Sequence, residues 1–287
     1  TTNPGALASA VLEDGVEHLH ASLMSDAHRA AFEAARRLQI PFTLTAYSGV
    51  DIFTRRDPQL YHSASNDPYC VSVIVEDAFM RDWMTRQYRV SPEKITIIPN
   101  SFDLELYSLK GERTSHEGLV ILAIARFVEK KGLIYLIEAF KKMSGKRPEA
   151  ELWLVGYGIE EGRLRQAAAG NERIKFLGAR PEVETRDLYS SVDIFCLPCI
   201  RTSSGDADGI PTTVLEAMAF ELPVVCTNLL SAPCYIKDGE DGILVPERDV
   251  TALSAALERL CADASLREEL GKSARARVER TCDLREN

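Results

Sequence analysis

The sequence lacks the features that mark nucleic-acid binders, membrane-spanning chains and secreted proteins. It has no run of lysines and arginines, and its net charge of −9 over 287 residues would repel a polyanion. No apolar stretch reaches the length that crosses a bilayer, and the first residues lack the charged-then-apolar form of a signal peptide. A cytoplasmic protein that binds no nucleic acid is therefore the expectation.

Cysteine and histidine are too scattered to indicate a metal site or a disulfide framework. The seven cysteines are odd in number and have apolar neighbours, which predicts reduced and mostly buried thiols. Cys196 and Cys199 have the C-x-x-C spacing of redox and zinc sites, but no second pair or histidine cluster completes such a site. The sequence thus predicts no metal site.

The chain does contain short apolar runs that alternate with amphipathic helices. Its composition, 45% hydrophobic and 27% charged, is ordinary for a globular protein, and its length suffices for two domains. The alternation predicts parallel α/β layers in two domains, 1–107 and 108–287, with the polar segment 108–117 as a linker. Strands are expected near 16–20, 41–46, 71–75, 94–98, 119–125, 151–155, 173–177, 193–197, 223–226 and 243–245. Helices are expected near 25–38, 77–88, 133–143, 160–169, 184–190, 212–220, 250–261 and 265–280.

Residues 201–226, RTSSGDADGIPTTVLEAMAFELPVVC, form the most informative stretch. A polar, glycine-bearing loop leads into Pro211, which is expected at the first position of a helix. The N–H groups of Thr212 and Thr213 would then point out of the helix start and, with the helix dipole, form an anion site suited to a phosphate. Glu216 lies about one turn deeper and could accept hydrogen bonds from a sugar diol.

This stretch resembles the acidic-x7-acidic signature of retaining glycosyltransferases of the GT-B fold, family 4. The usual sequence in that family is close to E-G-x-P-x-x-x-x-E-A-M-A-x-G-x-P-V-V. Asp208 replaces the usual first glutamate, which shortens the reach to a donor sugar by one methylene, and Glu221 replaces a usual glycine. The matching residues are Asp208-Gly209-Ile210-Pro211, Glu216-Ala217-Met218-Ala219 and Leu222-Pro223-Val224-Val225.

The resemblance implies an α/β fold of two Rossmann-like domains of the GT-B type, and it extends over nearly all of residues 16–287. The second domain matches a whole nucleotide-binding half of such an enzyme. The first matches only the later part of the other half, because residues 1–15 do not supply the strand, glycine-rich loop and further α/β pairs that usually come first. The N-terminal domain is therefore expected to be incomplete.

Two cations follow the buried strand 119–125, at the end of a parallel strand where ligands bind in open α/β sheets. Arg126 and Lys131 could flank a diphosphate there. The Arg126 guanidinium could donate two parallel hydrogen bonds, and the Lys131 ammonium would act as a point charge. Their spacing matches the family's R-x4-K-G motif, which implies that both face the donor diphosphate. Lys130 is interpreted as a surface neighbour. Together with Asp208, Arg126 and Lys131 form the predicted catalytic set.

Two glycine-bearing turns are expected beside the donor nucleotide. Gly156-Tyr157-Gly158 follows one strand, and the next glycine, Gly162, comes one position too late for a dinucleotide fingerprint. In the family a G-x-G turn lies near the nucleotide at this place. Gly178-Ala179-Arg180 matches a loop that contacts the base through its backbone. The predicted donor-binding residues are Gly156, Gly178, Arg180, Gly209, Ile210, Pro211, Thr212, Thr213 and Glu216.

In the first domain the family often places histidines after two strands. The matching stretches read His20-Ala21-Ser22-Leu23 and Thr45-Ala46-Tyr47-Ser48, so Ser22 and Tyr47 stand where histidines are usual. Both are candidates for the acceptor side of the site. Tyr47 could hydrogen-bond a sugar hydroxyl, or it could be an aromatic side chain half buried at a strand end.

The resemblance implies a retaining hexosyltransferase that moves a sugar from a nucleotide-diphosphate sugar to a hydroxyl acceptor, without metal or cofactor. The acceptor could be a carbohydrate, a lipid-linked molecule or a small molecule, in polysaccharide, glycolipid or glycoside biosynthesis. Acceptors of this kind would allow a loose, peripheral contact with the inner membrane. The sequence fixes neither the donor base nor the sugar. Three alternatives stay open: a non-catalytic nucleotide-sugar-binding subunit, a sugar-nucleotide epimerase of the GT-B fold, and a dinucleotide oxidoreductase.

Overall fold

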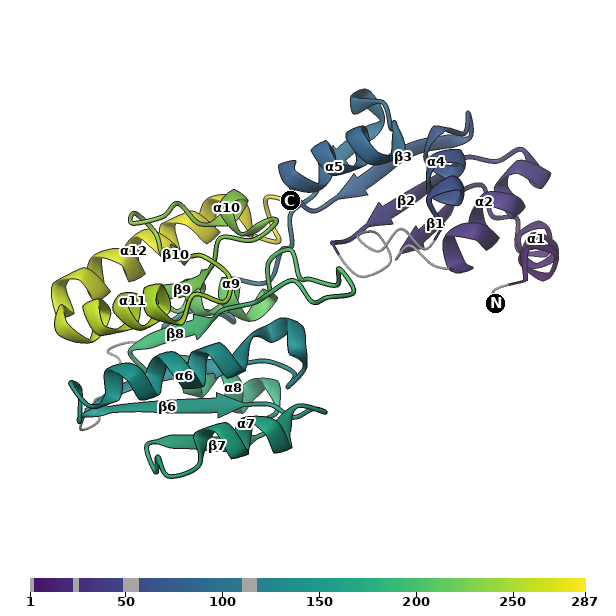
Figure 1. The fold of residues 1–287 in the computed structure, drawn as a ribbon. Helices are drawn as coiled ribbons and strands as arrows, with labels where there is room; N and C mark the ends of the chain where they lie inside the picture. The colour runs from purple at the N-terminus through teal and green to yellow at the C-terminus, as the bar shows by residue number, and fades with distance from the viewer. Residues whose placement is uncertain (1–2, 23–25, 49–56, 110–117) are drawn as a thin grey trace. The chain divides into compact units, whose positions relative to one another are not determined.

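The computed structural model describes residues 3–22, 26–48, 57–109 and 118–287, which form two compact units (Figure 1). One unit comprises Thr1–Asn100 with Ser204–Asp206, and the other comprises Ser101–Ser203 with Ala207–Asn287. The division falls before the expected boundary at residue 107. Residues 101–107 belong to the second unit because Phe102 and Tyr107 pack edge to face and the Tyr107 ring continues onto Phe220.

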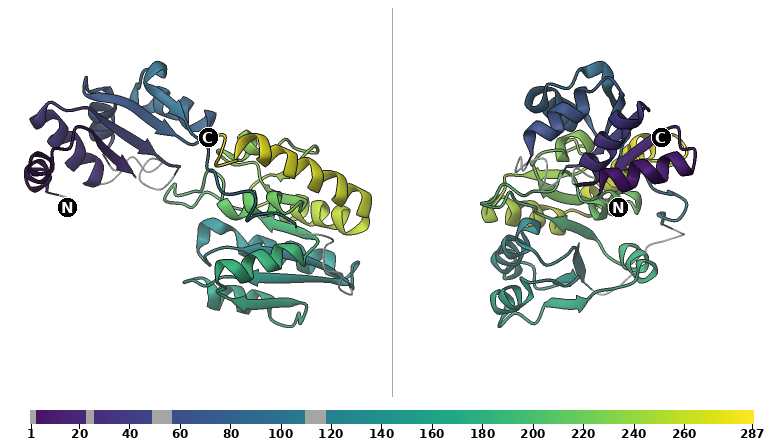
Figure 2. Two further views of the ribbon diagram at one scale, coloured as in Figure 1. Left: turned by 180° about the vertical axis from the view of Figure 1, so that it is seen from behind. Right: turned by 90° about the vertical axis from the view of Figure 1, so that its right-hand side faces the viewer.

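The first unit is a parallel sheet of four strands in the order β1-β2-β3-β4. Each strand pairs with the next one along the chain, so right-handed crossovers place the connecting helices on one face. Contacts of α2 with α4 and of α4 with α5 show these helices side by side (Figure 2). The elements are α1 (Pro4–Glu13), β1 (Leu19–Ser22), α2 (Asp26–Leu38), β2 (Phe42–Ala46), α4 (Pro58–Asn66), β3 (Cys70–Val75), α5 (Ala78–Tyr88), a 3-10 turn (Pro92–Lys94) and β4 (Ile95–Ile97).

Among the described residues of the first unit, two helices were not expected, and the first strand begins later than expected. Helices α1 and α4 each start with a capping side chain followed by proline. The Asn3 side chain accepts hydrogen bonds from two backbone N–H groups of α1, and the Asp57 side chain accepts one from the N–H of Leu60. An Asx residue before proline is a sequence signal for a helix start, so both helices could have been predicted from it.

Helix α5 agrees with its sequence pattern. Asp77 caps it by accepting a hydrogen bond from the N–H of Met80 at 2.9 Å. Met80 and Met84 are fully buried, and Phe79 and Trp83 pack against the same core as partly buried side chains. The apolar stripe of this helix is therefore core packing.

The second unit is a six-stranded parallel sheet in the order β10-β9-β8-β5-β6-β7. The chain winds from β5 outward to β7, then returns to the other side of β5 to start β8. Helix α6 contacts both α7 and α11 on one face, and α9 contacts α12 on the other (Figures 1 and 2). The elements are β5 (Leu119–Ile124), a 3-10 turn η2 (Glu129–Lys131), α6 (Leu133–Ser144), β6 (Ala150–Val155), α7 (Glu161–Ala168), β7 (Ile174–Gly178), α8 (Glu182–Ser190), β8 (Ile194–Leu197), α9 (Thr212–Ala219), β9 (Val224–Thr227), α10 (Ala232–Tyr235), β10 (Ile243–Val245), α11 (Val250–Ala262) and α12 (Ala264–Thr281).

The strands and helices expected in the second unit are all present, each within a few residues of its expected bounds. In the described part of this unit, only the short α10 and the turn η2 were not expected. Because the chain returns to the other side of β5 to form β8, the winding direction reverses between these two neighbouring parallel strands. Open α/β sheets bind ligands at such a switch point. Among the helices of the described ranges, none combines the length and the hydropathy needed to cross a bilayer.

Candidate functional site

The loop after β5 is seated directly on the loop after β8. Gly132, which ends the turn η2, has a φ of 66°, and a Cβ there would lie 1.9 Å from the carbonyl oxygen of Pro198. Only glycine fits this approach. The backbone N–H of Ile200 also donates a hydrogen bond to the carbonyl of Lys130 at 2.8 Å. The K-G end of the R-x4-K-G motif thus docks one loop of the switch point onto the other.

This docking brings two lysines to one carboxylate. The Lys131 Nζ lies 2.7 Å from Asp208 Oδ2, and the Lys130 Nζ lies 3.0 Å from Asp208 Oδ1. The three side chains are only 13%, 14% and 19% exposed for Lys131, Lys130 and Asp208. The interpretation of Lys130 as a surface neighbour is wrong, because the turn presents both ammonium groups to the segment that leads into α9.

The lysines keep Asp208 ionised. Burial by itself raises the pKa of the Asp208 carboxyl, but the charges and hydrogen bonds of Lys131 and Lys130 outweigh burial and leave the pKa below its ordinary value. The thiol of Cys199 lies 4.0 Å from the same carboxylate, and burial raises its pKa to about 12. The cluster is therefore two cations and one anion, with a net positive charge, beside a neutral thiol.

Helix α9 begins next to this cluster at Thr212, so Pro211 is its N-cap and not, as expected, its first helical residue. Pro211 has an extended ψ of 134° and occupies the N-cap, so Thr212 is the first helical residue. The Pro211 carbonyl accepts a hydrogen bond from the N–H of Val214 at 3.0 Å. Because the first residues of a helix have no carbonyl behind them, the N–H groups of Thr212 and Thr213 point out of its start. Gly209 and Ile210, just before, are buried.

Glu216 lies on the side of α9 that meets α8. Its Oε2 accepts a hydrogen bond from the hydroxyl of the buried Tyr189 at 2.9 Å. Burial raises the pKa of the Glu216 carboxyl, the Tyr189 bond partly offsets this, and the charge of Glu182 adds to the rise. Sequence reasoning missed Tyr189 as the residue that orients this carboxylate. No motif marks Tyr189 within the mostly polar helix α8, EVETRDLYS.

The G-x-G turn after β6 packs against the loop that carries Arg126. A Cβ at Gly156 would lie 1.9 Å from the Ala125 carbonyl oxygen, and one at Gly158 would lie 2.3 Å from that of Phe127. The Phe127 N–H donates a hydrogen bond to the Tyr157 carbonyl at 2.7 Å. The glycines thus permit close packing of two loops at the carboxyl edge, where the Arg126 side chain is exposed.

The loop after β7 continues this edge. The N–H of Gly156 donates to the Gly178 carbonyl at 2.9 Å, which ties the loops after β6 and β7 together. Gly178 has a φ of 71°, and no heavy atom lies within 4 Å of its missing Cβ. The Arg180 guanidinium turns back to the Leu177 carbonyl and to Glu184 of α8, at 3.0 and 3.1 Å. This leaves the backbone of the loop as the part that could face a base.

In the first unit, Ser22 and Tyr47 lie at the carboxyl edge of neighbouring strands. Ser22 ends β1 in register with Thr45 of β2, and Tyr47 directly follows β2 with 38% of its surface exposed. Sequence reasoning missed Glu76, which follows β3 at the same edge. This buried carboxylate accepts hydrogen bonds from the Ser48 N–H at 3.1 Å and from the Asn100 amide at 3.3 Å.

The thiols of the second sheet are buried, as predicted. Burial raises the pKa of Cys196, Cys199 and Cys226, so these groups stay protonated and unreactive. Six of the seven cysteines are buried free thiols, and Cys234 is exposed. Within the described ranges, no group of three or more His, Cys, Asp or Glu side chains is placed to hold a metal ion.

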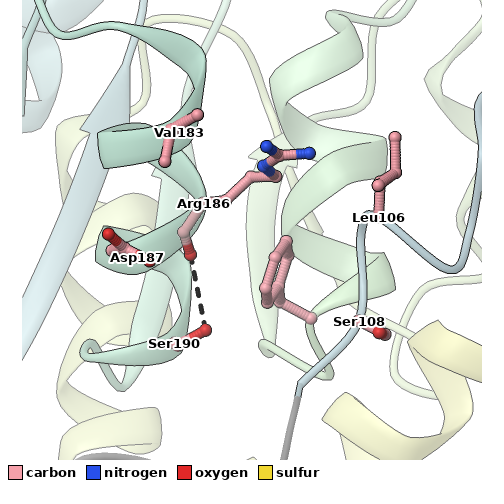
Figure 3. Close-up of a pocket in the computed structure, with 7 residues that line it drawn as sticks. Leu106, Ser108, Val183, Arg186, Asp187 and Ser190 are labelled. Atoms are coloured by element: carbon pink, nitrogen blue, oxygen red, sulfur yellow. Dashed lines mark hydrogen bonds between the residues drawn. The ribbon is translucent and has the colours of Figure 1, made fainter.

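A hollow of about 370 Å³ lies elsewhere on the second unit, between α8 and residues 106–108 (Figure 3). Arg186 points into it, but its guanidinium is 3.7 Å from a Glu182 oxygen and lies over the Tyr107 ring. The hollow is lined by none of the predicted site residues. We therefore place the candidate site at the Lys130–Lys131–Asp208 cluster, where convergent charge and the start of a helix meet at the switch point.

A doubly wound sheet with cations and a helix start at its switch point has the arrangement of a nucleotide-binding domain. Residues 109–277 match the family model described as "Glycosyl transferases group 1", and residues 2–106 match the model described as "Glycosyltransferase Family 4". The chain belongs to the group 1 family of glycosyltransferases, as its acidic-x7-acidic segment indicated.

Curated relatives match the chain over part of their length. It is 36% identical over 190 residues to the amylovoran biosynthesis glycosyltransferase AmsK of Erwinia amylovora, which covers 65% of this chain and 47% of the relative. It is 34% identical over 163 residues to a GDP-mannose-dependent phosphatidylinositol monomannoside mannosyltransferase of Corynebacterium glutamicum, covering 56% of this chain and 42% of the relative. The chain thus spans about half the length of the curated relatives it matches.

Solved structures confirm the expected fold class, α/β with two Rossmann-like domains of the GT-B type. The structure of Anabaena HepE, solved in complex with UDP and glucose, has a TM-score of 0.80 at 19% identity. The match covers 98% of this chain and 78% of the HepE chain. The sucrose-phosphate synthase of Thermosynechococcus elongatus matches 99% and 74% with a TM-score of 0.83 at 20% identity.

Proposed function

We propose that this protein transfers a sugar from a nucleoside-diphosphate sugar to a hydroxyl group during assembly of a polysaccharide or glycolipid. The observation that carries the proposal is the pair of buried ammonium groups at Asp208, beside the start of α9. The family to which the chain belongs, and the relatives that assemble polysaccharides and glycolipids, support the reaction class.

Charge is what the site supplies to this reaction. The bond between the anomeric carbon and the diphosphate oxygen breaks, and its electron pair leaves with the diphosphate. The acceptor oxygen bonds to that carbon, and its proton passes to the departing diphosphate. Lys131, Arg126 and the N–H groups that open α9 would stabilise the charge that develops on the leaving group more than they stabilise the bound donor. This difference lowers the barrier without a metal ion.

The remaining residues have roles in binding. Glu216 would hold the ribose hydroxyls, and the backbone of Gly178–Arg180 would lie against the base. Asp208, with the backbone of Gly209–Pro211, would orient the donor sugar. Ser22 and Tyr47 are the acceptor-side candidates. We further propose that the sugar is a hexose transferred with retention at the cytoplasmic side of the inner membrane, where lipid-linked acceptors are found.

Nucleotide binding is the direct test. A ligand of the native state stabilises it by mass action, so the donor's nucleotide should raise the unfolding temperature and release or take up heat on titration. Relatives with UDP and GDP-mannose in their names make UDP and GDP the probes. Glu216→Ala should weaken binding of the better probe about tenfold. Glu258→Ala changes a residue of α11 outside the site and should leave binding unchanged. A protein that binds neither nucleotide would overturn the proposal.

The reaction itself is tested with UDP-glucose and GDP-mannose. Transfer to an acceptor, or slow hydrolysis when only water is present, would support the proposal, and the anomeric configuration of the product by NMR decides retention. Binding of a nucleotide sugar without either reaction would indicate a non-catalytic subunit instead. Conversion of the sugar nucleotide to an isomer without any acceptor would indicate an epimerase.

A further inference from the structure

We propose that Lys130 is a positioning residue that holds the Asp208 carboxylate when the ammonium of Lys131 turns from Asp208 to the donor diphosphate. The R-x4-K-G pattern does not include Lys130, and this role rests on the proposed function.

The geometry gives each lysine its own oxygen. Lys130 Nζ lies 3.0 Å from Oδ1 of Asp208, and Lys131 Nζ lies 2.7 Å from Oδ2. The carboxylate therefore keeps a charged partner when one of the two leaves. Because all three side chains are mostly buried, each ion in the cluster needs such a partner. Neither lysine is redundant in this arrangement.

The backbone anchors the turn that carries both lysines, and the motif spacing indicates which of the two leaves Asp208. The carbonyl of Lys130 accepts a hydrogen bond from Ile200, in the loop that leads toward Asp208, and the next residue but one, Gly132, abuts Pro198 of that loop. Lys130 is thus anchored to the chain segment that carries Asp208. Lys131 is the residue whose spacing from Arg126 matches the diphosphate motif.

Without the Lys130 ammonium, Lys131 would have to serve both the carboxylate and the diphosphate. Removing a partner from a buried ion is costly, so Lys131 would stay with Asp208 and bind the nucleotide less well. If Asp208 were also made neutral, this competition would disappear. The role therefore predicts that the effect of losing Lys130 depends on the charge of Asp208.

A double-mutant cycle measures this dependence. The variants are Lys130→Met, Asp208→Asn and the two together, with UDP and GDP affinity measured by calorimetry on the whole chain. Lys130→Met should weaken binding of the better nucleotide about tenfold or more when Asp208 is present. In the Asp208→Asn background the same change should cost less than about threefold. Lys130→Arg, which keeps the charge, should bind within about threefold of the unmodified protein.

Controls separate this role from loss of folding and from general charge. Lys272→Met removes an exposed ammonium that pairs with Glu268 on α12, and it should leave affinity unchanged. Thermal unfolding of each variant shows whether it is folded; if Lys130→Met unfolds, the cycle is run with Lys130→Gln. Equal losses in both backgrounds, or none in either, would overturn this role alone. An unmodified protein that binds neither nucleotide would overturn the proposed function and this role with it.

Discussion

At the scale of single residues, the Asp208 carboxylate lies where the diphosphate of the proposed donor would also place negative charge. Asp208 pairs with both lysines in the structure, so a diphosphate bound as proposed would compete with a carboxylate of the protein itself. Such a site would give up part of its affinity for the diphosphate, because Lys131 must turn from Asp208 before it binds the donor. Once Lys131 faces the bound diphosphate, its charge needs no further reorganisation when the leaving group departs.

Lys131→Ala should lower the rate of sugar transfer by about 100-fold or more, because a cation at the departing diphosphate is lost. The fold should survive, since Asp208 retains Lys130 as its partner. The measurement is kcat with the donor that binds, alongside the unfolding temperature. Lys272→Ala serves as the control for removal of a lysine. Near-normal transfer by a folded Lys131→Ala protein would remove Lys131 from the mechanism.

His28 should make the first unit sensitive to acid. Its buried ring bonds the Ala21 carbonyl at 3.0 Å through Nε2. Burial lowers the pKa of His28 from 6.5 to about 4. The hydrogen bond to Ala21 opposes this shift, and His20 adds a smaller contribution that lowers the pKa further. The neutral ring therefore stabilises the first unit fully above pH 6.5, and this stabilisation is lost as the pH falls toward 4. At pH 5 the free energy of unfolding should be lower by about 2 kcal/mol.

The measurement is urea unfolding at pH 7 and pH 5. Trp83 lies in the first unit and Trp153 in the second, so a Trp153→Phe protein reports the first unit by fluorescence. In that background His28→Gln removes the titration and should flatten the pH dependence between these two values. The same loss of stability with glutamine as with histidine would show that other groups cause it.

At the scale of elements, the site depends on the turn η2, which packs the loop after β5 against the loop after β8. Its position relative to the loop after β8 is set by a glycine that no other residue can replace without moving backbone. Gly132→Ala should therefore cost at least about 3 kcal/mol of unfolding free energy, because the left-handed φ and the Pro198 carbonyl both oppose a Cβ.

Gly170 is a matched control for this substitution. It also has a left-handed φ, of 79°, but no heavy atom lies within 4 Å of its missing Cβ. Gly170→Ala should cost only about 1 kcal/mol, which is the backbone strain alone. Denaturant unfolding of both variants gives the comparison, and equal costs would mean that the contact with Pro198 relaxes freely.

At the scale of the whole molecule, the second unit contains the donor side of the proposed site and has its own core. We expect residues 101–287 alone to fold cooperatively and to bind the same nucleotide within about threefold of the whole chain. Calorimetry and chemical unfolding of the fragment provide the check, and a fragment that unfolds without a cooperative transition would contradict it.

The layout of the second unit could be predicted from the sequence because its central strands β5, β8 and β9 are buried on both faces. Such strands read as continuous apolar runs, and the runs at β5 and β8 are almost wholly buried in the structure. The first unit was predicted less well. Its first strand, LHAS, alternates and is mostly exposed, and α1 and α4 were overlooked because their signal lies in their caps.

The sequence by itself determined the family, the parallel α/β layers and the segments that hold Arg126, Lys131, Asp208 and Glu216, because local pattern and motif spacing encode these. Only the tertiary structure decided that Lys130 and Lys131 share one carboxylate and that Tyr189 orients Glu216. The physical reason is that these contacts join residues about 80 and about 30 positions apart. Side-chain partners at such separations are fixed by how loops pack at a sheet edge, which no local pattern records.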